Sequence, residues 1–395
     1  MEYDTDFRRG WFERPAIRHG FCWGVLFLLI SLISTGCNRE ASQVEPAAMH
    51  RANPARTGVY DTQGLEIFND IQWQFQTGDW IFAAPAISGE TVYIASYDGQ
   101  VYAINQDTGQ EQWRFATTEP ILATPAIADG IVLVGGMDGN AYGLDGQSGA
   151  EQWQLTIGGG FVASPAVVDQ LGYFASLDGV VVAIDVRSGR EVWRFEKAGT
   201  TIAFSPAVAD GAIFIPISDG VLYVLDAETG SELWTYNPAA GTRDVFQPAG
   251  DVVVADGRVY YMTSNMDLKG ILHTVDLETH ELIWRYQTPS EVFAGPTAID
   301  GFLIWGELSG NLYGVRAETG ELVWTFPTGD AIFSAVAGAG DLVYVGSADK
   351  NLYAVDIRTG IMKWQFRAES GVSSPAVADG TIFVGTESGV LYALR

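Results

Sequence analysis

Short apolar runs separated by polar turns fill most of this chain. Between residues 113 and 153, for example, runs such as Ile131 to Val134 and Ala141 to Leu144 are rich in β-branched and aromatic residues, and Asp129-Gly130 and Asp138-Gly139 separate them. No long window has a 3.6-residue periodicity, so helical arrays are excluded. The pattern predicts four short antiparallel strands in each unit.

A tryptophan closes each unit, and six of the seven gaps between successive tryptophans are 40 or 41 residues. A repeat of this length must stack on its neighbours to bury its faces, and four strands per repeat are typical of a propeller blade. We therefore predict an all-β fold, an eight-bladed up-and-down β-propeller. Its predicted blade-docking residues are Trp73, Trp113, Trp153, Trp193, Trp234, Trp284, Trp324 and Trp364.

The two ends of the repeat region complete each other. The last repeat stops at Arg395, before a tryptophan strand of its own, whereas Trp73 has no preceding turn. The strand at 71–76 is therefore predicted to be the outermost strand of the eighth blade, so that the N- and C-terminal strands close the ring.

Composition and charge fit one large monomeric propeller. The chain has 395 residues, of which 47% are hydrophobic and only 18% charged, with 46 glycines for turns. The net charge is −26, from 22 basic and 48 acidic residues. Because phosphate contacts need lysine and arginine, nucleic acid is excluded as a partner, and the acidic surface is interpreted as a solubility device.

The first 36 residues have the pattern of an export signal. Four arginines precede an apolar stretch from Phe21 to Ile33, which is short for a membrane span. Ser34-Thr35-Gly36-Cys37 follows and resembles a bacterial lipobox, with serine where leucine is usual. The resemblance implies lipidation of Cys37; an ordinary signal peptide or an uncleaved anchor is the alternative.

These features divide the chain into four predicted parts. They are a lipoprotein-type signal peptide at 1–36, a lipid-anchored polar tether at 37–49, a lead-in segment at 50–70 and the propeller at 71–395. We expect export and attachment to the cell envelope, on the periplasmic side of an outer membrane or on the outer face of a single membrane. Only the lipid would contact the membrane.

The turn before each tryptophan repeats a phrase: a small residue, then Asp, two variable residues, Thr or Ser, and Gly, with Trp four positions later. Ala183-Ile184-Asp185 to Gly189 and Ala354-Val355-Asp356 to Gly360 are two examples. The phrase resembles the tryptophan-docking repeat of pyrroloquinoline-quinone (PQQ) type propellers over 71–395. WD40 repeats fit less well, because Asp never follows these tryptophans and no Gly-His pair opens the repeats.

One repeat is irregular, since Trp234 and Trp284 are 50 residues apart. The extra residues lie at 237–248, before the blade's first strand, and at 264–270, between its second and third strands. Both places are expected on the same rim of the propeller, where they would form one prominence. A tolerated insertion is the alternative to a contact surface. The candidate partner-binding residues are Arg243, Asp244, Phe246, Met266 and Lys269.

The same repeat has His280 where the others have glycine, so its turn is expected to be altered or strained. His273 and His280 lack a third ligand nearby, so no metal site is predicted. Apolar residues at the start of each first strand are expected near one end of the central channel, where packing is favoured over a ligand site. They are Phe82, Leu122, Val162, Phe293 and Phe333, with Trp80 and Phe161 nearby.

The PQQ-type resemblance covers dehydrogenases and non-catalytic scaffolds. The dehydrogenases carry a vicinal cysteine pair and a calcium site, but Cys22 and Cys37 are the only cysteines here, and the repeated acids have turn roles. We therefore predict no catalytic residue and no cofactor. The architecture resembles the BamB-like outer-membrane assembly factors, which implies a scaffold that binds a protein partner through one propeller face. A quinoprotein or a small-ligand sensor remains the alternative.

Overall fold

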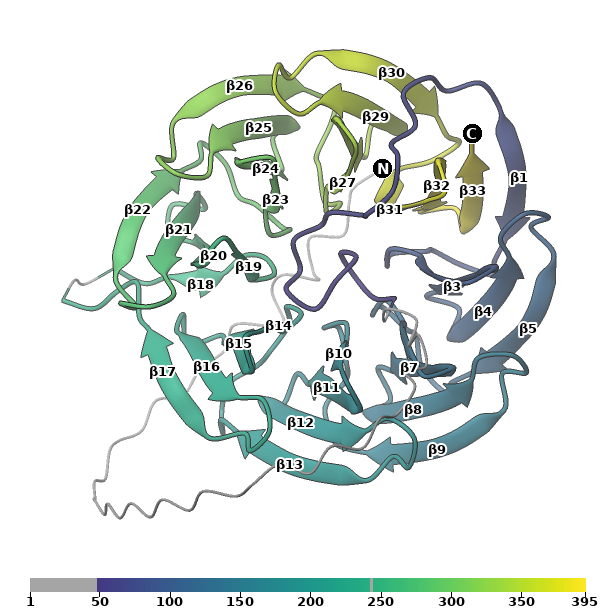
Figure 1. Cartoon of the computed structure of the whole chain (residues 1–395), viewed down its shortest axis with the longest axis horizontal. Helices are drawn as coiled ribbons and strands as arrows, with labels where there is room; N and C mark the ends of the chain where they lie inside the picture. The colour runs from purple at the N-terminus through teal and green to yellow at the C-terminus, as the bar shows by residue number, and fades with distance from the viewer. Residues whose placement is uncertain (1–47, 242–243) are drawn as a thin grey trace, which may run out of the picture. The chain divides into compact units, whose positions relative to one another are not determined.

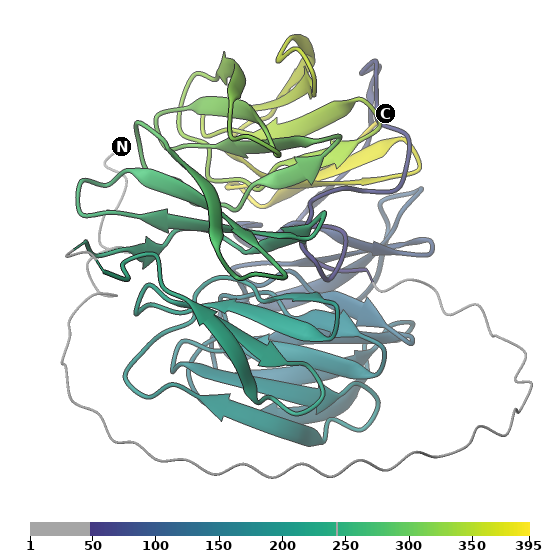
Figure 2. The ribbon, with the colours of Figure 1, turned by 60° about the vertical axis from the view of Figure 1, so that its left-hand side comes forward.

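The computed structural model describes residues 48–241 and 244–395, and these ranges fold into strands and turns without a helix. Eight antiparallel sheets stand side by side around a ring, which confirms the predicted eight-bladed propeller (Figure 1). Each sheet is twisted, as antiparallel strands require (Figure 2).

The strands of each blade run outward from the central channel. The strands are given from inside to outside. Blade 1 contains β2 (Ala86–Ser88), β3 (Thr91–Ala95), β4 (Gln100–Asn105) and β5 (Glu111–Ala116), and blade 2 contains β6 (Ala126–Ala128), β7 (Ile131–Gly135), β8 (Asn140–Asp145) and β9 (Glu151–Thr156). Blade 3 contains β10 (Ala166–Val168), β11 (Leu171–Ala175), β12 (Val180–Asp185) and β13 (Glu191–Glu196), and blade 4 contains β14 (Ala207–Ala209), β15 (Ala212–Pro216), β16 (Leu222–Asp226) and β17 (Glu232–Tyr236).

Blade 5 has an additional two-residue strand. Blade 5 contains β18 (Gln247–Pro248), β19 (Val253–Ala255), β20 (Arg258–Ser264), β21 (Gly270–Asp276) and β22 (Leu282–Gln287). Blade 6 contains β23 (Thr297–Ile299), β24 (Phe302–Gly306), β25 (Asn311–Arg316) and β26 (Leu322–Pro327), and blade 7 contains β27 (Ala337–Ala339), β28 (Leu342–Gly346), β29 (Asn351–Asp356) and β30 (Met362–Arg367). Blade 8 contains β31 (Val372–Ala378), β32 (Thr381–Thr386), β33 (Val390–Leu394) and β1 (Ile71–Gln76).

The hydrophobic core lies between the blades. The middle strands, such as β8, are buried on both faces because a blade packs on each side, whereas in an outer strand such as β9 little besides the tryptophan is fully buried. Between blades 1 and 2, Tyr93 and Trp113 pack against Ile127 and Val132. Each blade therefore buries its faces only against its neighbours.

The turn phrases fold as the sequence predicts. In blade 4, the Asp226 carboxylate accepts hydrogen bonds from the Thr229 backbone N–H and hydroxyl at 2.8 and 2.7 Å. Gly230 follows with a φ of 71°, and a Cβ there would lie 2.4 Å from the Trp193 ring. Glycine is thus required both by the left-handed backbone and by the indole.

In the part of the chain that the structure describes, seven of the eight docking tryptophans donate from the indole nitrogen to a main-chain carbonyl beyond their own blade, and Trp234 is the exception. Trp113 Nε1 donates to the Gly146 carbonyl at 2.9 Å, and Trp193 Nε1 to the Ala227 carbonyl at 2.9 Å. Blade 5 differs, because His280 keeps a left-handed φ of 61° and its imidazole stacks on Trp234 with 4.1 Å between ring centroids. The turn therefore keeps the shape that glycine gives it in the other blades, and of the two expected outcomes, an altered or a strained turn, the structure shows a left-handed non-glycine residue.

The ring closes as predicted, by antiparallel pairing of β1 with β33 from Ile71↔Leu394 to Gln76↔Val390. The lead-in segment completes the joint in a way that the sequence did not predict. Trp364, the last docking tryptophan, donates to the Leu65 carbonyl at 2.7 Å, and its ring lies 5.6 Å from Phe68. Residues 65–68 thus take the place of the missing eighth turn phrase.

The predicted signal, Cys37 and nearly all of the tether lie outside the described residues. Within the described ranges, no helix has the length and apolar character needed to cross a membrane.

Candidate functional site: the blade-five prominence and the channel plug

The two insertions of blade 5 form one prominence, as the sequence predicts. We call the described residues 237–241, 244–248 and 264–270 the blade-five prominence. In its short strand β18, Gln247 pairs with Ser264 and Pro248 with Thr263, so the inter-blade loop lies beside the end of the long hairpin β20–β21. The hairpin strands have seven residues each, whereas β15 and β16 have five. The prominence projects outward near β18 in Figure 1.

The candidate partner-binding residues differ in exposure. Met266 is 78% exposed, Asp244 is also exposed, and Lys269 is half-buried. Phe246 is only 5% exposed, so its expected display to solvent is wrong. Arg243 lies outside the described residues.

Leu268 is an exposed residue of the prominence that the sequence did not single out. It is 61% exposed and has a left-handed φ of 57°. The Asn265 side chain organises this turn, because its Oδ1 accepts the backbone N–H of Asp267 at 3.0 Å and of Lys269 at 3.1 Å. Met266 and Leu268 are thus held outward by a built turn rather than by a loose loop.

Phe246 packs into an aromatic pocket around His273 beneath the prominence. The His273 imidazole bonds to the Thr263 hydroxyl at 2.9 Å and to the Tyr236 hydroxyl at 3.3 Å, and the ring of Phe246 meets it edge-on at 5.8 Å. Burial, with a smaller effect of Arg285, lowers the pKa of His273 to about 4. A neutral histidine therefore contacts Tyr236, Phe246 and Thr263 at the base of the prominence.

His273 occupies a position that is tyrosine in six other blades. In five of those blades the phenol donates to an acid in the turn between the second and third strands. The pairs are Tyr102 and Asp98 (2.7 Å), Tyr142 and Asp138 (2.6 Å), Tyr223 and Asp219 (2.9 Å), Tyr313 and Glu307 (3.0 Å), and Tyr353 and Asp349 (2.6 Å). Blade 5 has His273 and a longer hairpin in place of this tyrosine–acid hydrogen bond.

A segment that the sequence did not assign to the ring fills its centre. We call residues 48–60 the plug. Ala48 bridges Ile127 in antiparallel fashion and Val59 bridges Gly338 in parallel fashion, so the plug turns back and leaves the channel at the end where it entered. Figure 1 shows this segment at the centre of the ring.

Carbonyl oxygens of the plug accept hydrogen bonds from the inner strands of five blades, at 2.7 to 3.0 Å. The acceptors are Ala48, Pro54, Ala55, Thr57 and Gly58, and the donors, in the same order, are the N–H groups of Ile127, Val208, Val254, Ala298 and Gly338. These inner edges would otherwise carry unpaired N–H groups in the channel. The plug therefore satisfies part of the inner wall of the propeller.

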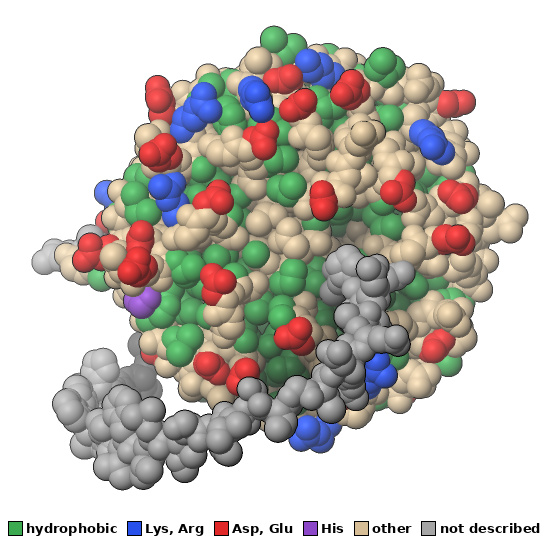
Figure 3. All heavy atoms as spheres, in the orientation of Figure 1, with side chains coloured by type: hydrophobic (Ala, Val, Ile, Leu, Met, Phe, Trp, Pro, Cys, Tyr) green, Lys and Arg blue, Asp and Glu red, His purple; other side chains and the backbone are tan. Residues whose placement is uncertain are grey.

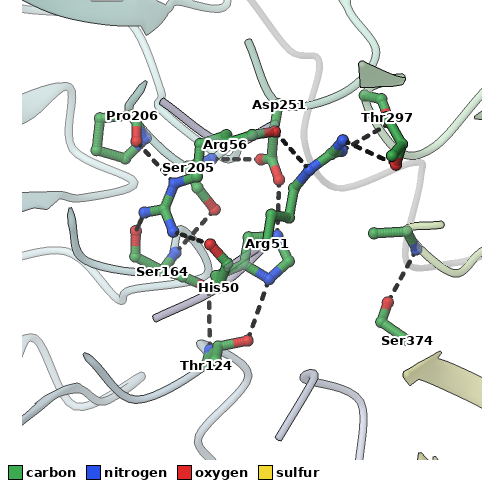
Figure 4. A network of polar contacts seen from close by, with 12 residues as sticks. His50, Arg51, Arg56, Thr124, Ser164, Ser205, Pro206, Asp251, Thr297 and Ser374 are labelled. Atoms are coloured by element: carbon green, nitrogen blue, oxygen red, sulfur yellow. Dashed lines mark hydrogen bonds and ion pairs between the residues drawn. The ribbon is translucent and has the colours of Figure 1, made fainter. Parts of the chain in front are cut away.

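Two buried arginines fasten the plug to the surrounding blades (Figure 4). Arg56 is fully buried and donates to the carbonyls of His50 (2.7 Å), Ser164 and Pro165 (both 2.9 Å) and Pro206 (3.0 Å). Arg51 donates to the carbonyls of Arg56, Gly295 and Pro296 and to the Thr297 hydroxyl. Burial lowers the pKa of Arg56 to about 10, which leaves it charged at neutral pH.

Asp251 supplies the carboxylate of this network. Its Oδ2 lies 2.8 Å from His50 Nε2, and its Oδ1 accepts the Ser205 backbone N–H at 2.7 Å. Burial alone would raise the pKa of Asp251, but His50, Arg51 and Arg56 outweigh it and hold that pKa well below its usual range. Burial lowers the pKa of His50 despite the carboxylate, so the neutral imidazole donates to Asp251 through Nε2.

Asp251 also belongs to a series of side chains that link neighbouring blades around the channel. Thr124 N–H donates to Ser164 Oγ at 2.9 Å, Ser164 N–H to Ser205 Oγ at 3.1 Å, and Ser205 N–H to Asp251. Blade 5 thus has a charged residue where blades 3 and 4 have serine. Asp251 lies three positions after the end of the prominence's inter-blade segment and five positions after Phe246.

The aromatic residues expected at one channel end form a packed cluster. Phe82 of blade 1 meets Phe293 of blade 6 edge-on at 6.3 Å, Phe293 meets Phe333 at 5.9 Å, and Trp80 meets Phe82 at 5.1 Å. Phe161, in contrast, is fully buried against Phe174, so it does not extend the mouth. Leu122 is also buried and Val162 half-buried.

One small cavity lies beside the plug among the described residues. A cavity of about 10 Å³ lies between His50, Arg51 and Tyr60 and the inner walls of blades 1, 7 and 8. This volume holds about one water molecule. Among the described residues, no cluster of three histidine, cysteine, aspartate or glutamate side chains could hold a metal ion.

Comparison with known proteins agrees with this architecture. The sequence profile of a family described as outer membrane protein assembly factor BamB matches residues 69–165, 122–268 and 268–395. The chain belongs to this family. No curated protein matches it significantly.

Solved structures with the same fold include BamB and quinoproteins. BamB from Moraxella catarrhalis is 18% identical, covers 83% of this chain and 100% of its own, and has a TM-score of 0.70. A quinohemoprotein alcohol dehydrogenase from Comamonas testosteroni is 14% identical, covers 89% and 80%, and has a TM-score of 0.72. The designed protein Ika8 is 19% identical, covers 82% and 99%, and has a TM-score of 0.72. At these identities the similarity shows the fold alone.

Proposed function

We propose that this protein is a non-catalytic scaffold of the cell envelope that binds a protein partner through the blade-five prominence. The observation that carries the proposal is the outward display of Met266 and Leu268 by an ordered turn on the one enlarged blade. Exposed methionine and leucine on a rigid support are typical of a protein contact surface. Membership of the BamB family supports a role in outer-membrane protein assembly, with an N-terminal lipid at Cys37 as the anchor.

A catalytic quinoprotein is the second candidate, because structures of that class share the fold. The residues here do not fit a quinone in the channel. The plug occupies the centre of the channel, the cavity beside His50, Arg51 and Tyr60 has room for about one water molecule, and both cysteines of the sequence precede the described residues. We therefore derive no reaction step through such a cofactor and favour the scaffold.

The proposal can be tested by crosslinking and affinity purification of the full-length protein from its own envelope. Met266→Glu with Lys269→Glu places new carboxylates on the prominence and should abolish recovery of the partner. Gln147→Glu, which changes an exposed residue in a turn of blade 2, is the matched control and should retain it. Equal recovery by all three proteins would show that the prominence is not the contact surface.

Addition of a quinone with calcium tests the second candidate separately. The scaffold proposal predicts no change of melting temperature and no new absorbance band on addition of the two ligands. A saturable shift would instead favour the quinoprotein.

A further inference from the structure

The eight blades provide their own comparison for one pair of exposed positions. The two residues just before each docking tryptophan lie at the start of the outer strand. In blades 1 and 2 they are Glu111-Gln112 and Glu151-Gln152. In blades 5 and 6 they are Leu282-Ile283 and Leu322-Val323, with exposed fractions of 41% to 44%. Since polar residues fold equally well at these positions, blade folding does not require apolar ones.

Acidic residues accompany the apolar pairs. Glu281 precedes Leu282, Glu321 precedes Leu322, and Glu232 precedes the 52%-exposed Leu233 of blade 4; all three glutamates are exposed. We call these eight residues, 232–233, 281–283 and 321–323, the apolar–acidic rim. Apolar and acidic side chains lie side by side on the face seen in Figure 3.

The outer strands of these blades differ in how their edges are protected. Proline and lysine usually block an exposed strand edge against pairing. Strand β26 of blade 6 ends in Pro327, and β30 of blade 7 carries Lys363. Strand β22, with the sequence LIWRYQ, has neither; the outer strands β1, β5, β9, β13 and β17 also lack both, but only β22 combines this with an apolar pair before its tryptophan. Strand β22 forms the outermost strand of its sheet in the described part of the chain. Its edge is thus open to a further strand.

We propose that the edge of β22 binds an extended segment of a protein partner with alternating basic and apolar side chains. Main-chain hydrogen bonds to β22 would give the pairing, Leu282 and Ile283 would contact the apolar side chains, and Glu281 the basic ones. A second copy of the chain is disfavoured because both copies carry a net charge of −26. A lipid surface is disfavoured because the glutamates would face its phosphates.

This surface is separate from the blade-five prominence. The hairpin β20–β21 turns at Ser264 and Gly270 on the prominence side, whereas β22 begins at the opposite end of the blade, after Asp276. The stacked pair of His280 and Trp234 lies at that same end. The inference therefore stands whether or not the prominence binds a partner.

The test measures binding of a fluorescent octapeptide of alternating lysine and valine to the full-length protein by anisotropy. Leu282→Gln with Ile283→Gln, which gives blade 5 the side chain found at Gln112 and Gln152, should weaken the Kd at least tenfold. The same two changes at Leu322 and Val323, beside the proline-blocked edge of β26, should change it less than twofold.

Two further peptides test strand pairing and charge. A peptide with proline in place of valine should not bind, because it cannot pair with β22, and one with glutamate in place of lysine should not bind, because Glu281 repels it. Equal affinity of the wild type and the blade-five variant for the lysine–valine peptide would overturn the proposal. A concentration-dependent dimer that the wild type forms and the blade-five variant does not would also overturn the proposal, because a second copy would then be the occupant. So would pelleting of the wild type, but not of the variant, with phosphatidylcholine vesicles, because a lipid surface would then be the occupant.

Discussion

Arg56→Ala tests whether the plug stabilises the ring. The guanidinium donates to four buried carbonyl oxygens from three segments of the chain, at 2.7 to 3.0 Å. Alanine removes all four hydrogen bonds and leaves the carbonyl oxygens buried without these donors. The loss is comparable to removing one partner from a buried charged network. Such truncations cost about 3–5 kcal/mol.

The size of this loss sets the expected thermal shift. With an unfolding entropy of about 2.1 cal/mol/K per residue, roughly 350 ordered residues give about 0.7 kcal/mol/K. A loss of about 4 kcal/mol then lowers the melting temperature by about 5–6 °C. Arg56→Lys should recover only part of this, because an ammonium group cannot donate to four fixed carbonyls as the planar guanidinium does.

Arg187→Ala is the matched control. That side chain is 67% exposed and pairs with Asp129 at 3.2 Å, so its loss should cost less than about 0.5 kcal/mol and shift the melting temperature by under about 1 °C. Calorimetry measures both shifts. Trypsin cleavage after Arg51 gives a second measurement, since the plug must leave the channel to be cut, and Arg56→Ala should accelerate it. If Arg56→Ala melts within 1 °C of Arg187→Ala and is cut no faster, the plug does not stabilise the propeller.

Three further predictions concern other parts of the ring. The pKa of His273 is lowered to about 4 from 6.5, so the unfolded chain binds more protons than the folded chain between these pH values. The free energy of unfolding should therefore have its full value above about pH 6.5 and fall by up to about 3 kcal/mol towards pH 4. Urea titrations at several pH values measure this slope, which His273→Phe should reduce, and an unchanged slope would contradict the assignment. Deletion of 71–76 removes the outermost strand of blade 8 and should cause a large loss of melting temperature; a loss below 2 °C would refute closure by β1. Gly189→Ala places a Cβ 2.4 Å from the Trp153 ring and should lower the free energy of unfolding by about 2–3 kcal/mol. Gly211→Ala, where φ is similar but the space is open, should lower it by about 1 kcal/mol. Equal losses of unfolding free energy in chemical denaturation would show that the indole contact is unimportant.

The repeat made the fold predictable from the sequence. A 40-residue period with one tryptophan per unit fixes the number of blades, and the missing turn before Trp73 identifies the strand that closes the ring. The blade-five prominence was predictable for the same reason, because an insertion is conspicuous against six regular gaps. Both predictions depend on comparison between repeats rather than on any single residue.

Features outside the repeat were not predictable in this way. Phe246 lies within an insertion, so no equivalent residue shows which way its side chain points, and its burial against His273 was missed. The plug was missed because Arg51 and Arg56 bind main-chain carbonyls, which leave no pattern in the sequence. Two signals could have pointed to it: two arginines five positions apart in a base-poor chain, and Asp251 where two preceding blades have serine.

The plug and the blade-five prominence are physically connected through Asp251. This carboxylate binds His50 of the plug and lies five positions after Phe246, which packs against His273. A partner that holds the inter-blade loop in place would also hold Asp251 against the plug, and a firmly seated plug would in turn fix the base of the loop. Because such coupling is reciprocal, the arginines at the centre of the ring contribute to the order of a surface that they do not touch. The described part of the insertion in the enlarged blade is thus connected to buried charged side chains at the centre of the ring.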